Sequence, residues 1–176
     1  TSLDPSMGTG GDYSAIQVFE LPTFEQVAEW HHNQTPMNQQ VRILQGINKH
    51  IHDTIMEADA TASPQIFYSM ENNTIGEAAL MRVMDIGEEN IMGMFLSEPI
   101  RKGHRRKFRR GFNTTAKHKI DACTKFKELV ENDKMKINSQ LLISEMKDFV
   151  ATGLSYKAKP GQHDDLVSAC LLMTRM

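Results

Sequence analysis

The stretch GQHDDLVSACLL, residues 161–172, opens on a polar turn and continues as an almost uninterrupted apolar run. Asp164 stands where a helix would begin, just after the Pro160-Gly161 turn. A helix that is apolar on nearly every side is buried, because a surface helix keeps one polar face. We therefore predict a buried final helix that starts near Asp164. The apolar positions behind this prediction are Leu166, Val167, Ala169, Cys170, Leu171 and Leu172.

Strand and helix signals alternate along the rest of the chain. Short runs rich in β-branched and aromatic residues predict strands, at 2–3, 13–21, 26–31, 65–70, 90–96 and 135–137. Apolar residues at helical spacing predict helices, at 38–55, 76–85 and 140–150, and a further one with its apolar face at 120–130 that residues 113–115 can cap. A hairpin arm is expected at 154–159. This order predicts an α/β domain with a mixed sheet flanked by helices.

Length and composition fit one globular domain. The chain has 176 residues, of which 40% are hydrophobic and 24% charged. No stretch approaches the ~20 apolar residues needed to cross a bilayer, and no signal pattern points to secretion. Cys123 and Cys170 lie on apolar helix faces without zinc spacing, so we expect reduced core thiols in a cytoplasmic setting. Because no turn, cap or linker precedes the first strand, we expect residues 1–176 to be one domain of a longer protein.

Four acidic residues stand at the ends of predicted elements. Asp4 follows the first strand, Glu71 follows the strand at 65–70, and Asp164 and Asp165 open the final helix. Carboxylates at strand ends and at a helix start can converge on one edge of a sheet. Such hard oxygen ligands suit Mg²⁺ or Mn²⁺ rather than zinc. Two ions roughly 3.5–4 Å apart could activate a water and stabilise the leaving oxygen in phosphodiester hydrolysis.

Each of these acids also has a simpler explanation. Asp164 alone is better explained as a helix cap, although Asp165 directly behind it weakens that interpretation, since one cap needs one side chain. Asp4 precedes a proline and could start a turn. Glu71 could be a solvated strand end. Asp12, after the glycines at 8–11, could be a further ligand, but a turn residue is the better interpretation. Taken singly, none of these residues establishes a site.

A basic window, RKGHRRKFRR at 101–110, holds seven of the 20 Lys and Arg and no acid. The rest of the chain carries 13 basic and 22 acidic residues, a net charge of −9. This asymmetry predicts a localised contact with a polyanion such as DNA, and Phe108 and Phe112 favour it over a solvated loop or a targeting signal. Lys157 and Lys159 could grip the same backbone, and His163 is the one histidine expected beside the acids. The predicted DNA-binding residues are Arg105, Arg106, Lys107, Arg109, Arg110, Lys117 and Lys119.

Four segments together resemble a known family, the C-terminal nuclease domain of the large terminase subunit of tailed bacteriophages, most closely the T-even-like myophage type. They are LDPS with the glycine-rich turn and Asp12-Tyr13, IFYSMENN leading to Gly76, TAKHK before a helix, and GQHDDLV. They occur in order and span essentially the whole chain. The HDDLV motif that opens an apolar helix is the most specific of them.

The resemblance implies a ribonuclease H-like fold in which acidic residues bind Mg²⁺ or Mn²⁺, with two ions expected. Carried over by position, Asp4, Glu71 and Asp164 would be catalytic ligands, and Asp165 and Asp12 additional ones. The implied activity is endonucleolytic cutting of double-stranded viral DNA concatemers, with little sequence preference, during genome packaging in the host cytoplasm. The implied partners are an ATPase domain of the same protein, which residues 1–176 lack, the portal and the small terminase subunit. No membrane contact is expected.

Two other functions remain open from the sequence. The same fold could serve a junction-resolvase-like or transposase-type nuclease, which would prefer branched DNA to linear DNA. A catalytically silent module that docks DNA or protein is the alternative outside the enzymes. In that case Asp4, Glu71 and Asp164 would be too far apart to share a metal ion.

Overall fold

A five-stranded mixed sheet lies at the centre of the computed structural model, which describes residues 1–99, 110–153 and 155–176. Its strands lie in the order β3-β2-β1-β4-β5. The β1–β2 and β2–β3 pairs are antiparallel, whereas the β1–β4 and β4–β5 pairs are parallel. The strands are β1 (Ser2–Asp4), β2 (Ser14–Glu20), β3 (Glu25–His32), β4 (Phe67–Met70) and β5 (Met94–Phe95). The predicted mixed sheet is confirmed.

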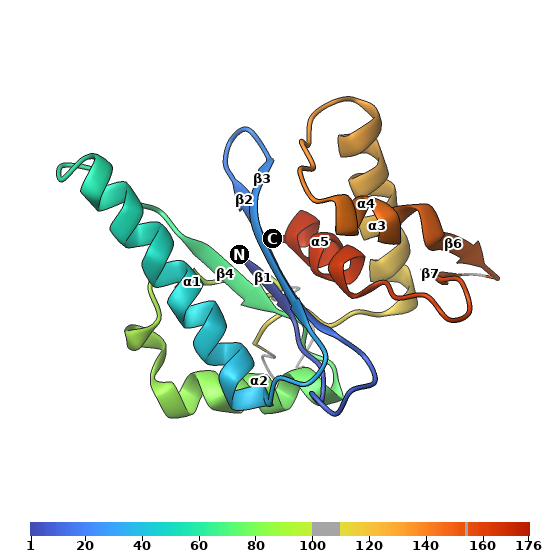
Figure 1. Cartoon of the computed structure of the whole chain (residues 1–176), viewed down its shortest axis with the longest axis horizontal. Helices are drawn as coiled ribbons and strands as arrows, with labels where there is room; N and C mark the ends of the chain where they lie inside the picture. The colour runs from blue at the N-terminus through green and yellow to red at the C-terminus, as the bar shows by residue number, and fades with distance from the viewer. Residues whose placement is uncertain (100–109, 154) are drawn as a thin grey trace.

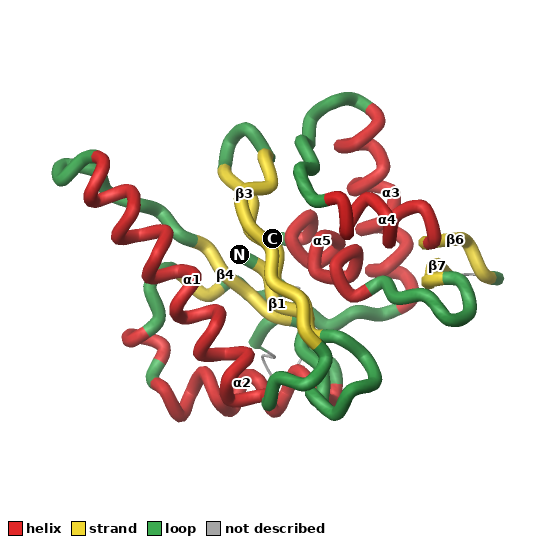
Figure 2. The backbone as a smooth tube through the Cα atoms, in the orientation of Figure 1, coloured by secondary structure: helices red, strands yellow, loops and turns green. Residues whose placement is uncertain are grey.

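Helices cover both faces of this sheet (Figure 1). One face carries α1 (Met37–Ala58) and α2 (Thr74–Ile86), and a short 3-10 helix, η1 (Glu88–Asn90), follows α2. The other face carries α3 (Ala116–Glu131), α4 (Gln140–Asp148) and α5 (Asp165–Arg175). A separate antiparallel hairpin, β6 (Phe149–Thr152) with β7 (Ser155–Ala158), projects beside α3 and α4 (Figure 2).

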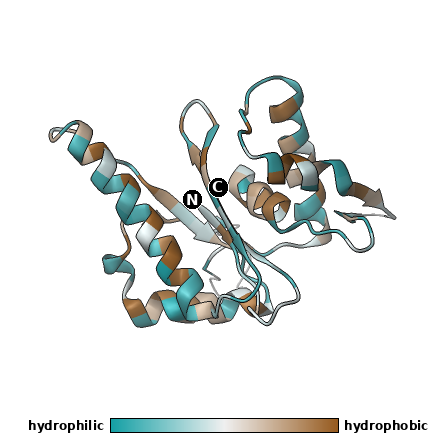
Figure 3. Cartoon of the chain, in the orientation of Figure 1, coloured by the Kyte–Doolittle hydropathy of each residue, from teal (hydrophilic) through white to brown (hydrophobic). Residues whose placement is uncertain are grey.

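The two faces of the sheet build two apolar cores because side chains alternate along each strand. On β2, Ile16 and Val18 pack in the cluster with α1 and α2, whereas Ala15 and Phe19 pack in the cluster with α3, α4 and α5. Figure 3 shows α5 as largely apolar, and Leu166 to Thr174 are buried apart from Ser168. The predicted buried final helix is confirmed. Both cysteines are free and buried, Cys170 within α5.

Three helix starts are capped by their own polar side chains. Asn73 accepts from the Gly76 amide at 2.8 Å, Thr115 from His118 at 3.2 Å, and Ser139 from Leu142 at 2.9 Å. Such caps satisfy amides that have no partner inside the helix. The cap predicted at 113–115 is therefore correct. No helix in the described part of the chain is both long and apolar enough to span a membrane.

The strand predicted at 90–96 is mostly wrong. Only Met94–Phe95 pairs with the sheet, because η1 occupies Glu88–Asn90 and Gly93 turns the chain with a φ of 113°. Strand propensity at the start of this run is overridden by a local turn, since an isolated run of β-formers gains little without a neighbouring strand.

Two further element predictions need correction near α4. The segment 135–137 is not a strand but makes an isolated parallel bridge, Glu25 to Lys136. The helix predicted to reach Val150 ends at Asp148, because Phe149 already belongs to β6. At Phe149 the chain changes from helix to a hairpin strand, and the apolar pattern alone does not show where the helix ends.

One glycine sets how closely α2 approaches the end of β4. A Cβ on Gly76 would lie 1.8 Å from the carbonyl oxygen of Glu71. Real Cβ atoms do not come this close, so a side chain at Gly76 would push α2 and Glu71 apart. By contrast, Gly46 in the middle of α1 has nothing within 4 Å of its Cβ position.

Gly76→Ala should lower the free energy of unfolding by about 1–3 kcal/mol, the usual cost of overpacking. Gly46→Ala is the matched control and should raise stability by up to about 1 kcal/mol, because alanine favours a helix. Urea denaturation of both variants measures this. Equal stability changes in the two variants would show that α2 does not need the close approach at Gly76.

Candidate active site

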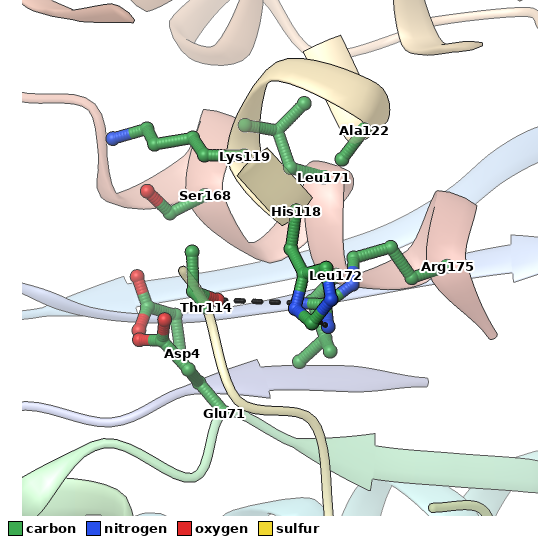
Figure 4. Close-up of a pocket in the computed structure, with 10 residues that line it drawn as sticks. All are labelled: Asp4, Glu71, Thr114, His118, Lys119, Ala122, Ser168, Leu171, Leu172 and Arg175. Atoms are coloured by element: carbon green, nitrogen blue, oxygen red, sulfur yellow. Dashed lines mark hydrogen bonds between the residues drawn. The ribbon is translucent and has the colours of Figure 1, made fainter. Parts of the chain in front are cut away.

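The parallel pairing of β1 and β4 brings two acids together. Leu3 pairs with Met70, and the Glu71 amide donates to the Leu3 carbonyl at 3.1 Å. The residues that follow in each strand, Asp4 and Glu71, therefore lie side by side at one edge of the sheet. Both line a pocket with residues of α5 and α3, and Figure 4 shows their carboxylates next to each other.

The pocket has a volume of about 150 Å³ and is lined by acidic, basic, apolar and hydroxyl side chains. Asp4 and Glu71 supply the acids, His118, Lys119 and Arg175 supply the bases, and Ala122, Leu171 and Leu172 supply apolar wall. Thr114 and Ser168 complete the lining. Acids and bases face a common space, so the pocket can hold a phosphate together with its cation.

Burial and neighbouring acids both raise the pKa of Asp4. Burial is the main cause that raises the pKa of Asp4 well above its usual value, and the charges of Glu71, Asp165 and Asp164 raise it further. A hydrogen bond between the Asp4 and Glu71 side chains acts in the same direction. Asn73 Nδ2 donates to Glu71 Oε2 at 2.7 Å and holds that carboxylate in place.

The acids of α5 form a second pair next to the first. Burial, and then the charge of Asp164, raises the pKa of Asp165 to about 6, while His163 and a backbone hydrogen bond from Tyr13 lower it. Asp164 Oδ2 accepts from the Ala158 amide at 3.1 Å and lies 3.7 Å from Lys119 Nζ. Neither Asp164 nor Asp165 lines the pocket of Asp4 and Glu71. Both act on Asp4 through their charges.

Of the five predicted ligands, only Asp4 and Glu71 are therefore in contact with each other. Asp4 and Glu71 touch, Asp164 and Asp165 lie within electrostatic range of Asp4, and exposed Asp12 is close enough for its charge to raise the pKa of Asp165. Among residues 1–99, 110–153 and 155–176, no three Asp, Glu, His or Cys side chains are arranged to hold a metal ion as they stand. Their chemistry fits Mg²⁺ or Mn²⁺, since crowded carboxylates are oxygen donors that a divalent cation neutralises.

The predicted DNA-binding residues are only partly placed. Arg105, Arg106, Lys107 and Arg109 lie outside the described residues. Arg110 is ion-paired with Glu88 and lies 5.0 Å from the centre of the Phe95 ring, so its charge is partly used within the fold. Phe112 is buried, 4% exposed, with Arg175 5.2 Å from its ring centre. The use of Phe112 as a sign of DNA contact is therefore wrong. Lys117 is exposed, and Lys119 lines the pocket.

Sequence patterns identify Lys119 but miss the other two bases of the pocket, His118 and Arg175. They single out His163, whose Nδ1 lies 3.6 Å from Asp165 Oδ2, but His118 also lines the site, with its Nδ1 2.8 Å from the Asn113 carbonyl. Arg175 donates to Asn113 and Thr114 at 3.1 and 3.2 Å and pairs with Glu98. A lone arginine at the end of an otherwise apolar helix is the signal that could have identified it.

The sequence also gives no sign of Glu145, on α4. It is 7% exposed, and its Oε2 accepts from the amides of Leu166 and Val167 at 2.9 and 3.2 Å. Burial is the largest cause that raises the pKa of Glu145 to about 7, and the charges of Asp165 and Asp164 add to it. A buried acid therefore supports the helix that carries the aspartates.

A sheet ordered β3-β2-β1-β4-β5 with carboxylates at the ends of β1 and β4 defines a ribonuclease H-like domain. Residues 1–176 match the family model of the terminase RNaseH-like domain, and the chain belongs to this family. The family resemblance inferred from the sequence is confirmed, and so is the ribonuclease H-like fold.

Solved structures of phage terminase nucleases share the fold. The large terminase nuclease of the thermophilic phage G20c with bound magnesium is 16% identical, with a TM-score of 0.64 over 99% of this chain and 80% of that one. The cobalt-bound form is 17% identical, with a TM-score of 0.64 over 99% and 78%. The large terminase nuclease domain of Thermus phage P74-26 is 17% identical, with a TM-score of 0.57 over 97% and 76%.

The acid cluster makes stability depend on pH in metal-free buffer. Asp165 and Glu145 have pKa values of about 6 and about 7 in the fold, against roughly 4 when unfolded. The folded state therefore binds protons more tightly. This contribution is fully present below about pH 4 and is lost as pH rises through 6 to 7. The thermal midpoint in EDTA should fall by several degrees between about pH 4 and pH 7.5, at roughly 2–4 °C per kcal/mol.

Two controls sharpen this measurement. Glu25 and Asp53, which are partly exposed, have lowered pKa values, chiefly through hydrogen bonds from Lys136 and Lys49 respectively, and act in the opposite direction. High salt screens these surface pairs more than the buried cluster. Asp4→Asn removes one perturbed acid and should flatten the pH dependence. A midpoint that stays level or rises with pH in high salt would contradict the prediction.

Proposed function

We propose that this domain is a metal-dependent endonuclease that cuts double-stranded viral DNA concatemers during genome packaging. The observation that carries the proposal is the contact between Asp4 and Glu71, with Asp164 and Asp165 close enough to perturb Asp4. A protein that only needed a stable core would gain nothing by gathering like charges at a sheet edge. Perturbed acids in a cleft are typical of functional sites. The magnesium- and cobalt-bound G20c nucleases, which share the fold, support the same assignment.

In this proposal Asp4, Glu71 and Asp164 hold two Mg²⁺ or Mn²⁺ ions, with Asp165 and Asp12 as additional ligands. Bound divalent cations supply Lewis acidity toward a phosphodiester and toward water. The chain's own contribution is to fix the ligands. Glu71 is held by Asn73 and by the sheet, which sets its position before any ion arrives.

The basic side of the pocket receives the DNA phosphate in this proposal. Lys119 is the best placed group, because its Nζ lies 3.7 Å from Asp164 Oδ2 while its side chain remains 23% exposed. His118 and Arg175 are held by the Asn113 carbonyl and the Glu98 carboxylate. They stiffen the wall of the pocket and add positive charge near the acids.

The packaging context is also part of the proposal. Residues 1–176 would be the nuclease domain of a longer protein whose ATPase domain drives packaging in the host cytoplasm. The portal and the small terminase subunit are the expected partners, and the T-even-like myophage type remains a prediction. Membership of the terminase RNaseH-like family supports this setting.

Purified protein with Mn²⁺ or Mg²⁺ should nick or linearise supercoiled plasmid. Asp4→Asn, Glu71→Gln and Asp164→Asn should each lower the cutting rate by about 100-fold or more, because each removes an anionic ligand from the site. Asp121→Asn and Glu57→Gln change exposed acids on α3 and α1 and serve as matched controls. Gel assays of plasmid cutting measure the rates.

Several outcomes would overturn the assignment. Unchanged cutting by Asp4→Asn or Asp164→Asn would rule out the acid cluster as the catalytic centre. Strong preference for four-way junctions over linear duplex would favour a junction resolvase. Absence of both cutting and Mn²⁺ binding by the folded wild-type protein would favour a silent docking module.

The basic window is tested separately from the acids. Replacing Arg105, Arg106 and Arg109 together with alanine should weaken duplex binding and reduce its salt dependence, by roughly 0.9 in the slope of log K against log salt for each phosphate that is no longer neutralised. Arg110→Ala is made alone, because Glu88 and Phe95 engage Arg110 and its removal should mainly lower stability. Fluorescence anisotropy in increasing salt gives the slopes. An unchanged slope in the triple variant would exclude the window from DNA contact.

A further inference from the structure

The start of α5 is capped differently from the starts of α2, α3 and α4. Those three helices are each capped by the side chain at their own N-cap position. At α5 that position belongs to Asp164, a residue type that caps well. Its side chain caps none of the α5 amides, all of which lie in the described part of the chain. It turns instead to the Ala158 amide and toward Lys119.

A carboxylate from another helix takes over the capping. Glu145 lies 21 residues before Leu166, and one oxygen, Oε2, accepts from both Leu166 and Val167. An acceptor at this place is favourable, because the first amides of a helix have no partner inside the helix. The other oxygen, Oε1, lies 3.8 Å from His31 Nε2. Glu145 is buried, so water does not compete for its oxygens.

We propose that Glu145 is a positioning residue that caps α5 from α4 and thereby frees Asp164 and Asp165 to serve the metal site. This inference rests on the proposed function. A helix start with unsatisfied amides attracts the nearest acceptor, and the nearest acceptor would be Asp164 itself. With Glu145 in place the amides are already satisfied. The Asp164 carboxylate then keeps its contacts with the Ala158 amide and with Lys119, which lines the pocket.

Because Glu145 caps α5 from α4, the positions of Asp164 and Asp165 also depend on how α4 is held. The α4 start is fixed by Ser139, whose Oγ donates to Glu29 on β3 at 2.6 Å. The start of α5 is therefore tied to the sheet through α4. Partners that orient metal ligands in this indirect way typically change metal affinity by about 10–100-fold when removed.

Three substitutions separate the reach of Glu145 from its charge. Glu145→Gln keeps an oxygen at the same distance and should preserve the cap. Glu145→Asp keeps the charge but shortens the side chain by one methylene, so its oxygens fall short of the Leu166 and Val167 amides. Glu145→Ala removes both. The Asp and Gln variants differ least from the natural residue in size, so they carry the test if the Ala variant does not fold.

Mn²⁺ affinity is measured by calorimetry or electron paramagnetic resonance on folded protein without DNA. Relative to wild type, Glu145→Asp and Glu145→Ala should bind Mn²⁺ about 10-fold or more weakly, and Glu145→Gln within about threefold. Hydrogen exchange at the Leu166 and Val167 amides gives a second readout, with protection abolished in the Asp and Ala variants and retained in the Gln variant.

The outcomes distinguish this inference from the proposed function. If wild-type protein neither binds Mn²⁺ nor cuts DNA, the proposed function fails. If wild type does both and Glu145→Asp binds Mn²⁺ as tightly as wild type, the capping role is wrong and the nuclease assignment stands. Equal weakening in Glu145→Gln and Glu145→Asp also overturns the inference, because it would show that charge and reach are not separable at this position.

Discussion

The parallel pairing of β1 with β4 is the constraint on which the site depends. It sets Leu3 beside Met70, and the next residue of each strand is an acid. A slip of one residue would turn Asp4 toward the apolar cluster of α1 and α2, since neighbouring side chains of a strand face opposite ways. Ser2 opposes such a slip, because its hydroxyl donates to the Ala169 carbonyl of α5 at 2.7 Å. Register and chemistry are therefore fixed by the same contacts.

The acids held by this pairing work against the stability of the fold. Two unit charges 4 Å apart repel by about 4 kcal/mol at an effective dielectric constant of 20, and burial adds a desolvation cost. The protein answers in two ways. Burial and the neighbouring acids raise the pKa of Asp4, which favours its uncharged form, and Lys119 and Arg175 bring positive charge to the same pocket. Neither removes the crowding. Repulsion among the acids that only a cation can relieve favours binding of a cation at this site.

Much of the fold followed from pattern, because the patterns that were strongest report burial. The apolar run of α5 and the strands on either side of the glycine-rich turn were predicted correctly. The failures lie where pairing partners decide the outcome. Met94–Phe95 is a strand only where β4 accepts it, and residues 135–137 find no full partner strand in the described part of the chain. Among the site residues, Asp4 and Glu71 could be expected near each other because both follow predicted strands, whose ends can meet at one edge of a sheet. Arg175 is marked in the sequence only as a lone arginine at the end of an apolar helix, and the approach of Arg175 and His118 to the acids depends on how α3 and α5 pack.

Glu145 shows most clearly why local sequence is insufficient. Asp164 occupies a position at which an aspartate ordinarily caps, and the local sequence offers no reason to expect otherwise. The side chain that caps α5 comes from 21 residues earlier, across a hairpin whose own course the apolar pattern misjudged. In the proposed function two demands meet at Asp164, a cap for a buried helix and a ligand for a cation, and one carboxylate cannot satisfy both. Supplying the cap from α4 resolves this conflict. Asp165, the second aspartate of the HDDLV motif, is therefore not a second capping residue, because Asp164 itself does not cap the helix.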